Sequence, residues 1–261
     1  MDILLRQIIC GKVLINFNGH DIIISEPTVE QKYIAEEKYL LAKDFALDKG
    51  LMGDEESKKY IKWGEDKELE LRAIMSEIDD MKVKLFNSRF KSNTKISLRQ
   101  AIKSKKNTLN KLLDNRYSFF EHTAEGYAIL EREMFLLQNN IKSFEFFLNS
   151  RDIQSLYLLY KKKTYIPEEK IRKLARSPEW TRIYSNREYG QLFSRPVSDW
   201  TDNQISLCSW SNTYSSALSS QSPPDLSVLD DDDMFDGWFI SQRKKDAEEK
   251  INVENSKINN S

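Results

Sequence analysis

Only one segment of this chain has the residue pattern of β-strands. Residues 12–24 read KVLINFNGHDIII, in which two runs rich in valine and isoleucine flank the dipeptide Asn18-Gly19. Asn-Gly tolerates positive φ at both central positions of a type I′ turn, so the segment predicts a hairpin that pairs Lys12–Phe17 with His20–Ser25. Two strands alone are marginally stable. The hairpin must therefore pack against helices or against a partner.

The rest of the sequence favours helices. With 8 glycines and 6 prolines in 261 residues, the chain has too few turn formers for an all-β protein and too few glycines for a nucleotide-binding sheet protein. Lysine, glutamate, leucine, isoleucine and serine dominate instead. We therefore predict a mainly α fold, a multi-helix assembly with a small N-terminal β-hairpin.

The first predicted helix has clear signals at both ends. Thr28 and Gln31 form a capping-box pattern, and Gly50 stands where a helix commonly ends. Between them runs a broad apolar stripe with charges opposite, the pattern of an amphipathic helix. The stripe consists of Tyr33, Ile34, Leu40, Leu41, Phe45 and Leu47.

Charge is segregated along the chain, although the formal net charge is only −1. We predict a short helix from Asp54 to Gly64 and a longer one from Glu65 to Phe86. The chain is acidic from Asp54 to Asp80, whereas residues 82–116 contain eleven Lys or Arg and a single acid. Such a basic stretch with two phenylalanines is typical of nucleic-acid binding, in which aromatic rings stack on bases. The alternative is an ordinary amphipathic helix whose basic face is solvated or meets the acidic segment. The candidate nucleic-acid-binding residues are Arg89, Lys91, Lys95, Arg99, Lys103, Lys105 and Lys106.

Helices also account for much of the second half. Apolar spacing predicts helices over Tyr117–Leu148 and Ile153–Tyr160, and Thr201 with Gln204 repeats the capping-box pattern. Beyond Lys250 the chain has nothing to bury, so a frayed tail is predicted.

The segment LDDDDMFDGWFISQ, residues 229–242, admits two interpretations. Asp230–Asp233 with Asp236 could hold Mg²⁺, but consecutive acids on a helix point in different directions. The acids fit better as the N-terminal cap of a helix, with the basic Arg243–Lys245 toward its C-terminal side. Its bulky apolar side chains must be buried, and we predict that they dock the helix on its own fold or on a partner. The candidate partner-binding residues are Met234, Phe235, Trp238 and Phe239.

No motif for catalysis or cofactor binding is present. The chain has no Gly-x-Ser-x-Gly elbow and no Walker or Rossmann loop, and neither His20 nor His122 has metal-ligand spacing. We expect a protein that is not an enzyme and has no metal or cofactor. Two isolated cysteines and the absence of a membrane-length apolar run predict a cytoplasmic protein with no membrane partner.

An ordered set of segments resembles a family of large contractile-tailed phages. These are SEPTVEQKYIAEEKYLLAKDFALDKGLMGDEE, then EKIRKLARSPEWTRIYS, LFSRPVSDWTDNQISLCSWSNTY and LDDDDMFDGWFISQRKKDAEEK. The family is similar to the tail assembly proteins or baseplate hub assembly chaperones of T-even-like phages. The resemblance covers most of residues 1–250, and the Ser- and Asn-rich C-terminal region departs from it.

The resemblance implies a non-enzymatic phage protein that binds other tail or baseplate proteins, as an assembly chaperone or as a minor virion part. It would act in the host cytoplasm, and retention in the virion is an alternative. The other hypothesis is a nucleic-acid-binding accessory protein that uses residues 82–116. By organisation, we divide the chain into a hairpin (1–27), a helical domain (28–150), a Trp- and Tyr-rich helical region (151–222), and a linker, C-terminal helix and tail (223–261).

Overall fold

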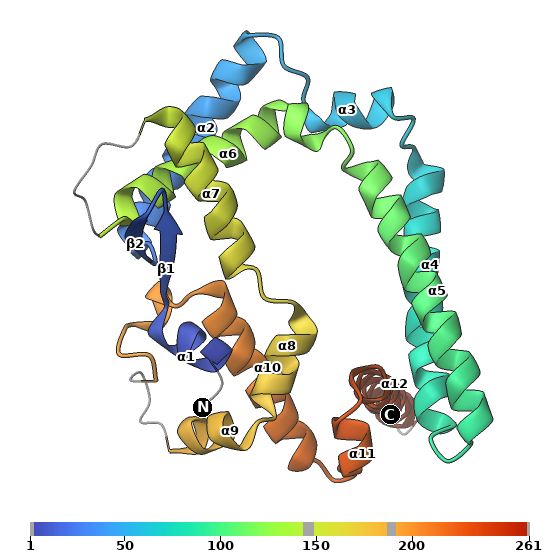
Figure 1. Ribbon diagram of the computed structural model, residues 1–261. Helices are drawn as coiled ribbons and strands as arrows, with labels where there is room; N and C mark the ends of the chain where they lie inside the picture. The colour runs from blue at the N-terminus through green and yellow to red at the C-terminus, as the bar shows by residue number, and fades with distance from the viewer. Residues whose placement is uncertain (1–2, 143–148, 187–191, 260–261) are drawn as a thin grey trace. The chain divides into compact units, whose positions relative to one another are not determined.

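The computed structural model describes residues 3–142, 149–186 and 192–259, and it confirms a mainly α fold with one small β-hairpin (Figure 1). The chain forms two compact units. Unit 1 combines Met1–Ser57 with Phe119–Tyr214, and unit 2 combines Lys58–Ser118 with Ser215–Ser261. Each unit therefore joins two segments that are far apart in the sequence, whereas the predicted divisions at 27, 150 and 222 follow the order of the chain.

The predicted hairpin is confirmed with its register. Strand β1 (Lys12–Phe17) pairs antiparallel with β2 (His20–Ser25), from Lys12 opposite Ser25 to Phe17 opposite His20. Asn18 and Gly19 have φ values of 52° and 83°. These are the left-handed conformations that a type I′ turn requires and that asparagine and glycine tolerate best.

One face of the hairpin is part of the core of unit 1. The segment after α6 pairs with strand β2: Ile141 forms an isolated antiparallel β-bridge with Ile24, and the Lys142 amide donates to the Ile23 carbonyl at 2.8 Å. Helices therefore cover one face of the hairpin, which by itself would be only marginally stable in water. The core cluster consists of Val13, Ile15, Phe17, Ile22, Ile24, Leu137, Ile141 and Leu156.

A short helix that the sequence did not predict precedes the hairpin. Helix α1 (Ile3–Cys10) buries Leu5 and Ile8. It is fixed by helix α10 (Asp202–Leu218), because the fully buried side chain of Gln204 donates to the Ile8 carbonyl at 2.8 Å. Gln204 also completes the predicted capping box with Thr201, each accepting from the other's backbone amide at 3.0 Å.

Helices α2 (Val29–Asp48) and α6 (Ala124–Asn140) form an antiparallel pair in unit 1 (Figure 1). The predicted capping box of Thr28 and Gln31 is confirmed at the start of α2. Three cross-helix contacts fix the register: Gln31 to the Asn139 carbonyl at 3.4 Å, Glu36 to Arg132 at 3.4 Å and Lys43 to Glu125 at 3.0 Å.

The buried side of α2 differs from what its apolar stripe suggests. The only side chains of α2 that are buried are Ala35 and Ala46, and α6 buries Ala124 and Ala128. Alanine lets two helix backbones approach closely, so the small residues occupy the contact between the helices. The apolar stripe faces outward, with exposed fractions of 75% for Tyr33, 40% for Ile34, 57% for Leu40, 66% for Leu41, 53% for Phe45 and 43% for Leu47.

The remaining helices of unit 1 are α7 (Ser150–Thr164), α8 (Glu168–Ala175) and α9 (Pro178–Ser185), with short 3₁₀ turns η1 (Phe120–His122) and η2 (Val197–Asp199). Helix α7 is longer than predicted. Helix α6 begins after η1 and is shorter than the predicted Tyr117–Leu148, of which residues 143–148 lie outside the described part. Trp180 of α9 is fully buried, donates to the Ser211 hydroxyl at 2.7 Å and stacks on Phe193.

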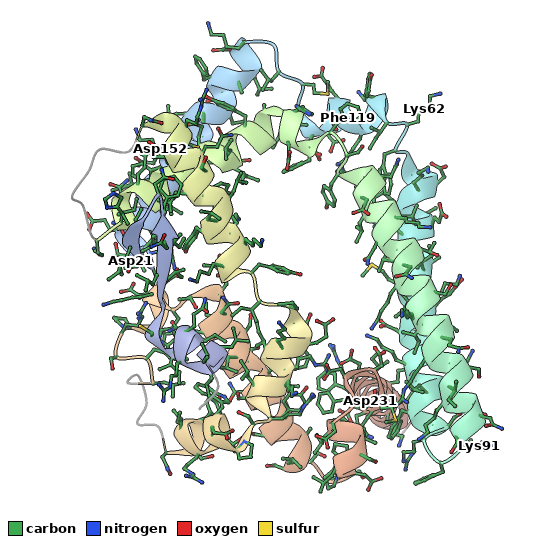
Figure 2. The ribbon with its side chains drawn as sticks, viewed as in Figure 1. Asp21, Lys62, Lys91, Phe119, Asp152 and Asp231 are labelled. Carbon is green, nitrogen blue, oxygen red and sulfur yellow. The ribbon has the colours of Figure 1, made fainter. Side chains whose placement is uncertain are left out.

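Unit 2 is built on a helical hairpin. Helices α4 (Glu65–Asn87) and α5 (Ser92–Arg116) lie side by side, and Lys91 marks their connection (Figures 1 and 2). The preceding helix α3 (Asp54–Tyr60) is shorter than predicted, and the short α11 (Leu226–Leu229) leads into the long α12 (Asp232–Asn259). Helix α12 packs against α4. No described helix has the length and apolar content needed to cross a membrane.

The end of α12 corrects two expectations. The tail beyond Lys250 was expected to be frayed, but the helix continues to Asn259. As a result, Arg243–Lys245 lie in the middle of the helix and do not complement its C-terminal dipole. Lys244 instead pairs with Asp80 of α4 at 3.2 Å, so this basic run contributes to a contact between helices.

At Gly237 the backbone of α12 closely approaches that of α4. A Cβ atom at this position would lie 2.1 Å from the backbone oxygen of Lys82 and 3.0 Å from the Val83 nitrogen. Glycine in a helix interior destabilises the helix by roughly 0.5–1 kcal/mol relative to alanine. The absence of a side chain at Gly237 is therefore required by packing.

We expect Gly237→Ala to destabilise unit 2 by about 1–3 kcal/mol, because the added methyl group overlaps α4 backbone that cannot rotate away. The free energy of unfolding in urea measures this effect. Gly53→Ala is the control, since no atom lies within 4 Å of a Cβ built there. A Gly237→Ala protein as stable as the wild type, or more stable, would contradict the close contact.

Candidate functional site

The acidic run before the C-terminal helix begins that helix, as predicted. The Asp231 carboxylate accepts a hydrogen bond from the Met234 amide at 2.9 Å, and the Phe235 amide donates to the Asp231 carbonyl at 2.8 Å. Asp231 is therefore the N-cap of α12. Asp232 and Asp233 occupy the first turn, where negative charge is favoured by the helix dipole.

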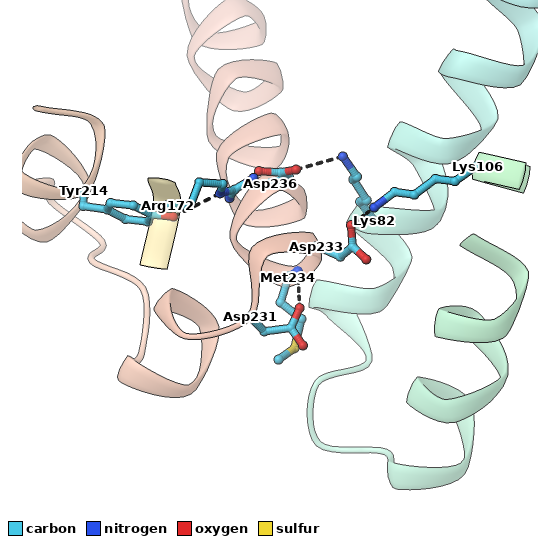
Figure 3. A network of polar contacts seen from close by, with 8 residues as sticks. All are labelled: Lys82, Lys106, Arg172, Tyr214, Asp231, Asp233, Met234 and Asp236. Carbon is cyan, nitrogen blue, oxygen red and sulfur yellow. Dashed lines mark hydrogen bonds and ion pairs between the residues drawn. The ribbon is translucent and has the colours of Figure 1, made fainter. Parts of the chain in front are cut away.

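The same acids bind the basic residues of α4 and α5. Asp233 pairs with Lys106 at 2.8 Å, and Asp236 pairs with Lys82 at 2.8 Å (Figure 3). Asp231 also accepts from Arg99. Within residues 3–142, 149–186 and 192–259, no group of three or more His, Cys, Asp or Glu side chains could hold a metal ion. The acidic run is thus one side of a contact between helices of unit 2.

The basic segment is partly neutralised in the same way. Of the seven candidate nucleic-acid-binding residues, Arg99 and Lys106 bind α12. Arg89 lies 3.7 Å from Asp225, and Lys105 pairs with Glu77. No ion pair is found for Lys91, Lys95 or Lys103 among the described residues. The expected contact with the acidic segment before Asp80 is therefore found for Lys105 alone among these four, whereas Arg89, Arg99 and Lys106 meet Asp225, Asp231 and Asp233 near the start of α12.

The two phenylalanines proposed to stack on bases already have a cationic partner. The Arg89 guanidinium lies 4.6 Å from the ring centroids of both Phe86 and Phe90. Phe90 is nonetheless 81% exposed. Arg89 is therefore positioned between two rings and is less accessible to a phosphate group than its sequence context suggests.

Most of the candidate partner-binding residues are buried. Met234, Phe235 and Trp238 are between 1% and 5% exposed, whereas Phe239 is 39% exposed. Phe235 contacts the rings of Trp238 and Phe239 with centroid separations of 5.7 and 6.4 Å. Phe239 is thus the most accessible of the four, and binding of a partner through them stays a prediction.

A cavity in unit 1 was not found from the sequence. Its volume is about 500 Å³, and it lies between the end of β2, helices α2, α6 and α7, and the start of α10. Apolar walls come from residues such as Leu136, Ile166 and Trp200. Glu26, Tyr160 and Asp202 add polar groups from three separate parts of the chain.

Several charged groups in the cavity lining neutralise one another. Arg132 lies 3.4 Å from Glu36 and 3.2 Å from Glu133, and Lys161 lies 3.7 Å from Glu133. Glu26 and Asp202 have no hydrogen bond or ion pair with any described residue, and neither does the Tyr160 hydroxyl. The cavity therefore contains two unpaired carboxyl groups beside a paired network.

Burial raises the pKa of the Glu26 carboxyl, and the nearby Asp202 raises it further against the opposing effect of Lys32. Burial also raises the pKa of the Tyr160 hydroxyl, with Glu26 as the next contributor. Both shifts have the same physical cause, because negative charge is poorly solvated in this cavity. An ionised Glu26 is accordingly unfavourable for the folded protein.

No family model, curated protein or solved structure matches this chain. Sequence reasoning missed the cavity because Glu26 and Asp202 lie in no motif for binding or catalysis and are 176 positions apart. The only local signals are that Glu26 follows a strand and that Asp202 stands inside a capping box. Their shared location results from tertiary packing, which brings the segment after β2 and the start of α10 to the same cavity.

We expect Glu26→Gln to raise the thermal midpoint at pH 7 and to leave it unchanged near pH 4. A carboxyl whose pKa is higher in the folded state binds protons more tightly there. Its contribution therefore favours folding below the unfolded pKa, and it is lost as pH rises through the folded pKa. Calorimetry at both pH values measures the effect.

The matched control is Glu37→Gln, which changes an exposed glutamate in the middle of α2. We expect no comparable gain at pH 7 from that change. Equal midpoints for Glu26→Gln and wild type at neutral pH would show that the Glu26 carboxylate is solvated and not destabilising.

Proposed function

We propose that this chain is a non-enzymatic protein that binds other tail or baseplate proteins of a contractile-tailed phage during assembly, as a chaperone or as a minor structural part. The phage context rests on the sequence resemblance. The observation that carries the binding role is the outward apolar stripe of α2. Large apolar side chains exposed together on one face commonly mark a site of protein interaction.

The stripe has the spacing of a helix-binding surface. Tyr33, Leu40 and Leu47 repeat every seven residues, and Ile34 and Leu41 repeat in parallel with them. A seven-residue repeat keeps side chains on one face, where they can interlock with a second helix. We therefore infer that the occupant of this face is an amphipathic helix of the partner protein.

The acidic residues beside the stripe indicate which charge the partner helix should carry. Glu30, Glu37 and Asp44 are exposed and also repeat every seven residues. At about 100° per residue, these acids lie between the two apolar ridges. A partner helix with Lys or Arg beside its apolar seam would complement them. A second copy of α2 would place acid against acid, which disfavours self-association through this face.

Nucleic-acid binding is the weaker alternative. Lys91, Lys95 and Lys103 are the candidate cations without an ion pair among the described residues, and they could contact phosphate groups. Four of the seven candidates instead neutralise acids of the same chain, so binding nucleic acid through them would require those ion pairs to break. The apolar stripe of α2 has no comparable covering, which favours a protein partner.

Capture from phage-infected cells tests the proposal. We expect affinity-tagged wild-type protein to retain tail or baseplate proteins, and the double variant Leu40→Lys, Leu41→Lys to lose at least about tenfold of them. Lysine at these positions removes apolar contact and repels a basic partner helix. Mass spectrometry of the retained proteins provides the measurement.

The control is Leu69→Lys, Leu158→Lys, which makes the same change at leucines that are 57% and 64% exposed on other helices. It should retain tail proteins as the wild type does. Circular dichroism of both variants checks that they are folded. Equal retention by the α2 variant and the wild type, or retention of no tail protein by either, would count against the proposal.

A further inference from the structure

We propose that the cavity of unit 1 binds an aliphatic cation, an ammonium or guanidinium group on a short apolar stem, with Glu26 as its counter-ion. This site is separate from the α2 surface, and the inference does not depend on the proposed function. The cavity supplies the three features such a ligand needs, which are a sufficient volume, an apolar wall and an unpaired carboxylate.

The volume and walls fit a short aliphatic chain. A cavity of about 500 Å³ lies within the range of small-molecule sites in proteins, which runs from about 300 to 1,000 Å³. Leu136, Ile166 and Trp200 give part of its lining an apolar character. A cationic head group on a hydrocarbon stem would bury the stem against these walls and leave the charge for the polar side.

The sign of the ligand follows from the pairing of the lining charges. Arg132 and Lys161 are already bound to Glu36 and Glu133, so the cations of the cavity are largely satisfied. Lys32 makes only a long contact of 3.5 Å with the Ser198 carbonyl. Glu26 and Asp202 have no hydrogen bond or ion pair among the described residues, so two unpaired acids of the lining stand against one weakly bound cation, Lys32. The cavity therefore favours a ligand with a positive charge.

Glu26 is the more informative of the two acids because its position is unfavourable for stability. A partly buried carboxylate without a hydrogen bond is destabilising, and glutamine or an apolar residue would fit the site at lower cost. Residues that destabilise a fold are retained where binding or activity needs them. An ammonium group would supply the missing hydrogen bonds and restore the charge balance.

Binding should also depend on pH. A cation stabilises the ionised form of Glu26, so the ligand and a proton compete for the same carboxyl group. Affinity is expected to be full at neutral pH and to fall as the pH drops through the raised pKa of Glu26. The charged or titratable groups that surround Glu26 come from α2, α6, α7, α10 and the segment before α10: Lys32, Glu133, Tyr160, Asp202 and Arg195.

The test is a ligand-observed NMR titration of the full chain with n-pentylammonium and with 1-pentanol, its neutral counterpart. We expect n-pentylammonium to bind about tenfold more tightly than 1-pentanol, the scale of one charge-assisted hydrogen bond. Glu26→Gln should remove this preference, and Glu169→Gln, a change at an exposed glutamate of α8, should retain it. Lowering the pH to 5 should weaken binding of the ammonium and leave that of the alcohol unchanged.

Equal binding of the ammonium and the alcohol, no binding of either, or an unchanged preference in Glu26→Gln would overturn the proposal. The thermal midpoint of Glu26→Gln shows whether the variant is folded, so a loss of preference is not confused with unfolding. Two further ligands identify the source of the cation. Tighter binding of spermidine indicates a free polyamine, and tighter binding of the peptide acetyl-Gly-Lys-Gly-amide indicates a lysine side chain of another protein.

Discussion

The contact between α2 and α6 determines which surface unit 1 presents. Ala35 and Ala46 are the buried residues of α2, and the polar contacts from Gln31 to Lys43 hold the two helices in antiparallel register. Because the small residues occupy this contact, the large apolar residues of the helix point outward.

This register also shapes the cavity. Helix α2 supplies Lys32 and Glu36 to its lining, and α6 supplies Arg132 and Glu133. Because Glu36 and Arg132 are paired across the helices, the register of α2 on α6 determines which lining charges are neutralised. Glu26 lies just before α2 and remains unpaired. The same helix pair thus supports both the proposed protein-binding surface and the proposed cation site.

Unit 2 uses a different kind of contact. The backbone of α12 approaches α4 at Gly237, where no side chain intervenes. Around this point Lys82 and Lys106 bind Asp236 and Asp233. Partly exposed ion pairs are worth little individually, typically about 0.2–1 kcal/mol, so their main contribution is to the register of the helices. The close backbone contact, which depends on glycine, supplies the packing.

Local features were predictable from the sequence, and long-range ones were not. The Asn18-Gly19 hairpin and the capping boxes at Thr28 and Thr201 depend on residues within a few positions of one another, and the structure confirms them. The outward direction of the α2 stripe depends on the packing of α2 against α6, about 90 positions away in the sequence. The sequence of an apolar stripe does not indicate whether the stripe packs into the core or is exposed for binding a partner. Likewise, the basic segment showed its charge but not that α12 would neutralise part of it.

The central claim is that the apolar stripe of α2 is open in the isolated chain and covered by a partner in the assembly. Hydroxyl-radical footprinting measures this directly, because oxidation of Leu and Phe side chains reports their exposure. The account predicts that Leu40, Leu41 and Phe45 of the isolated protein are oxidised about as fast as the exposed Leu158, and that they become protected in tail complexes purified from infected cells. Slow oxidation in the isolated protein, or equal oxidation in both states, would contradict it.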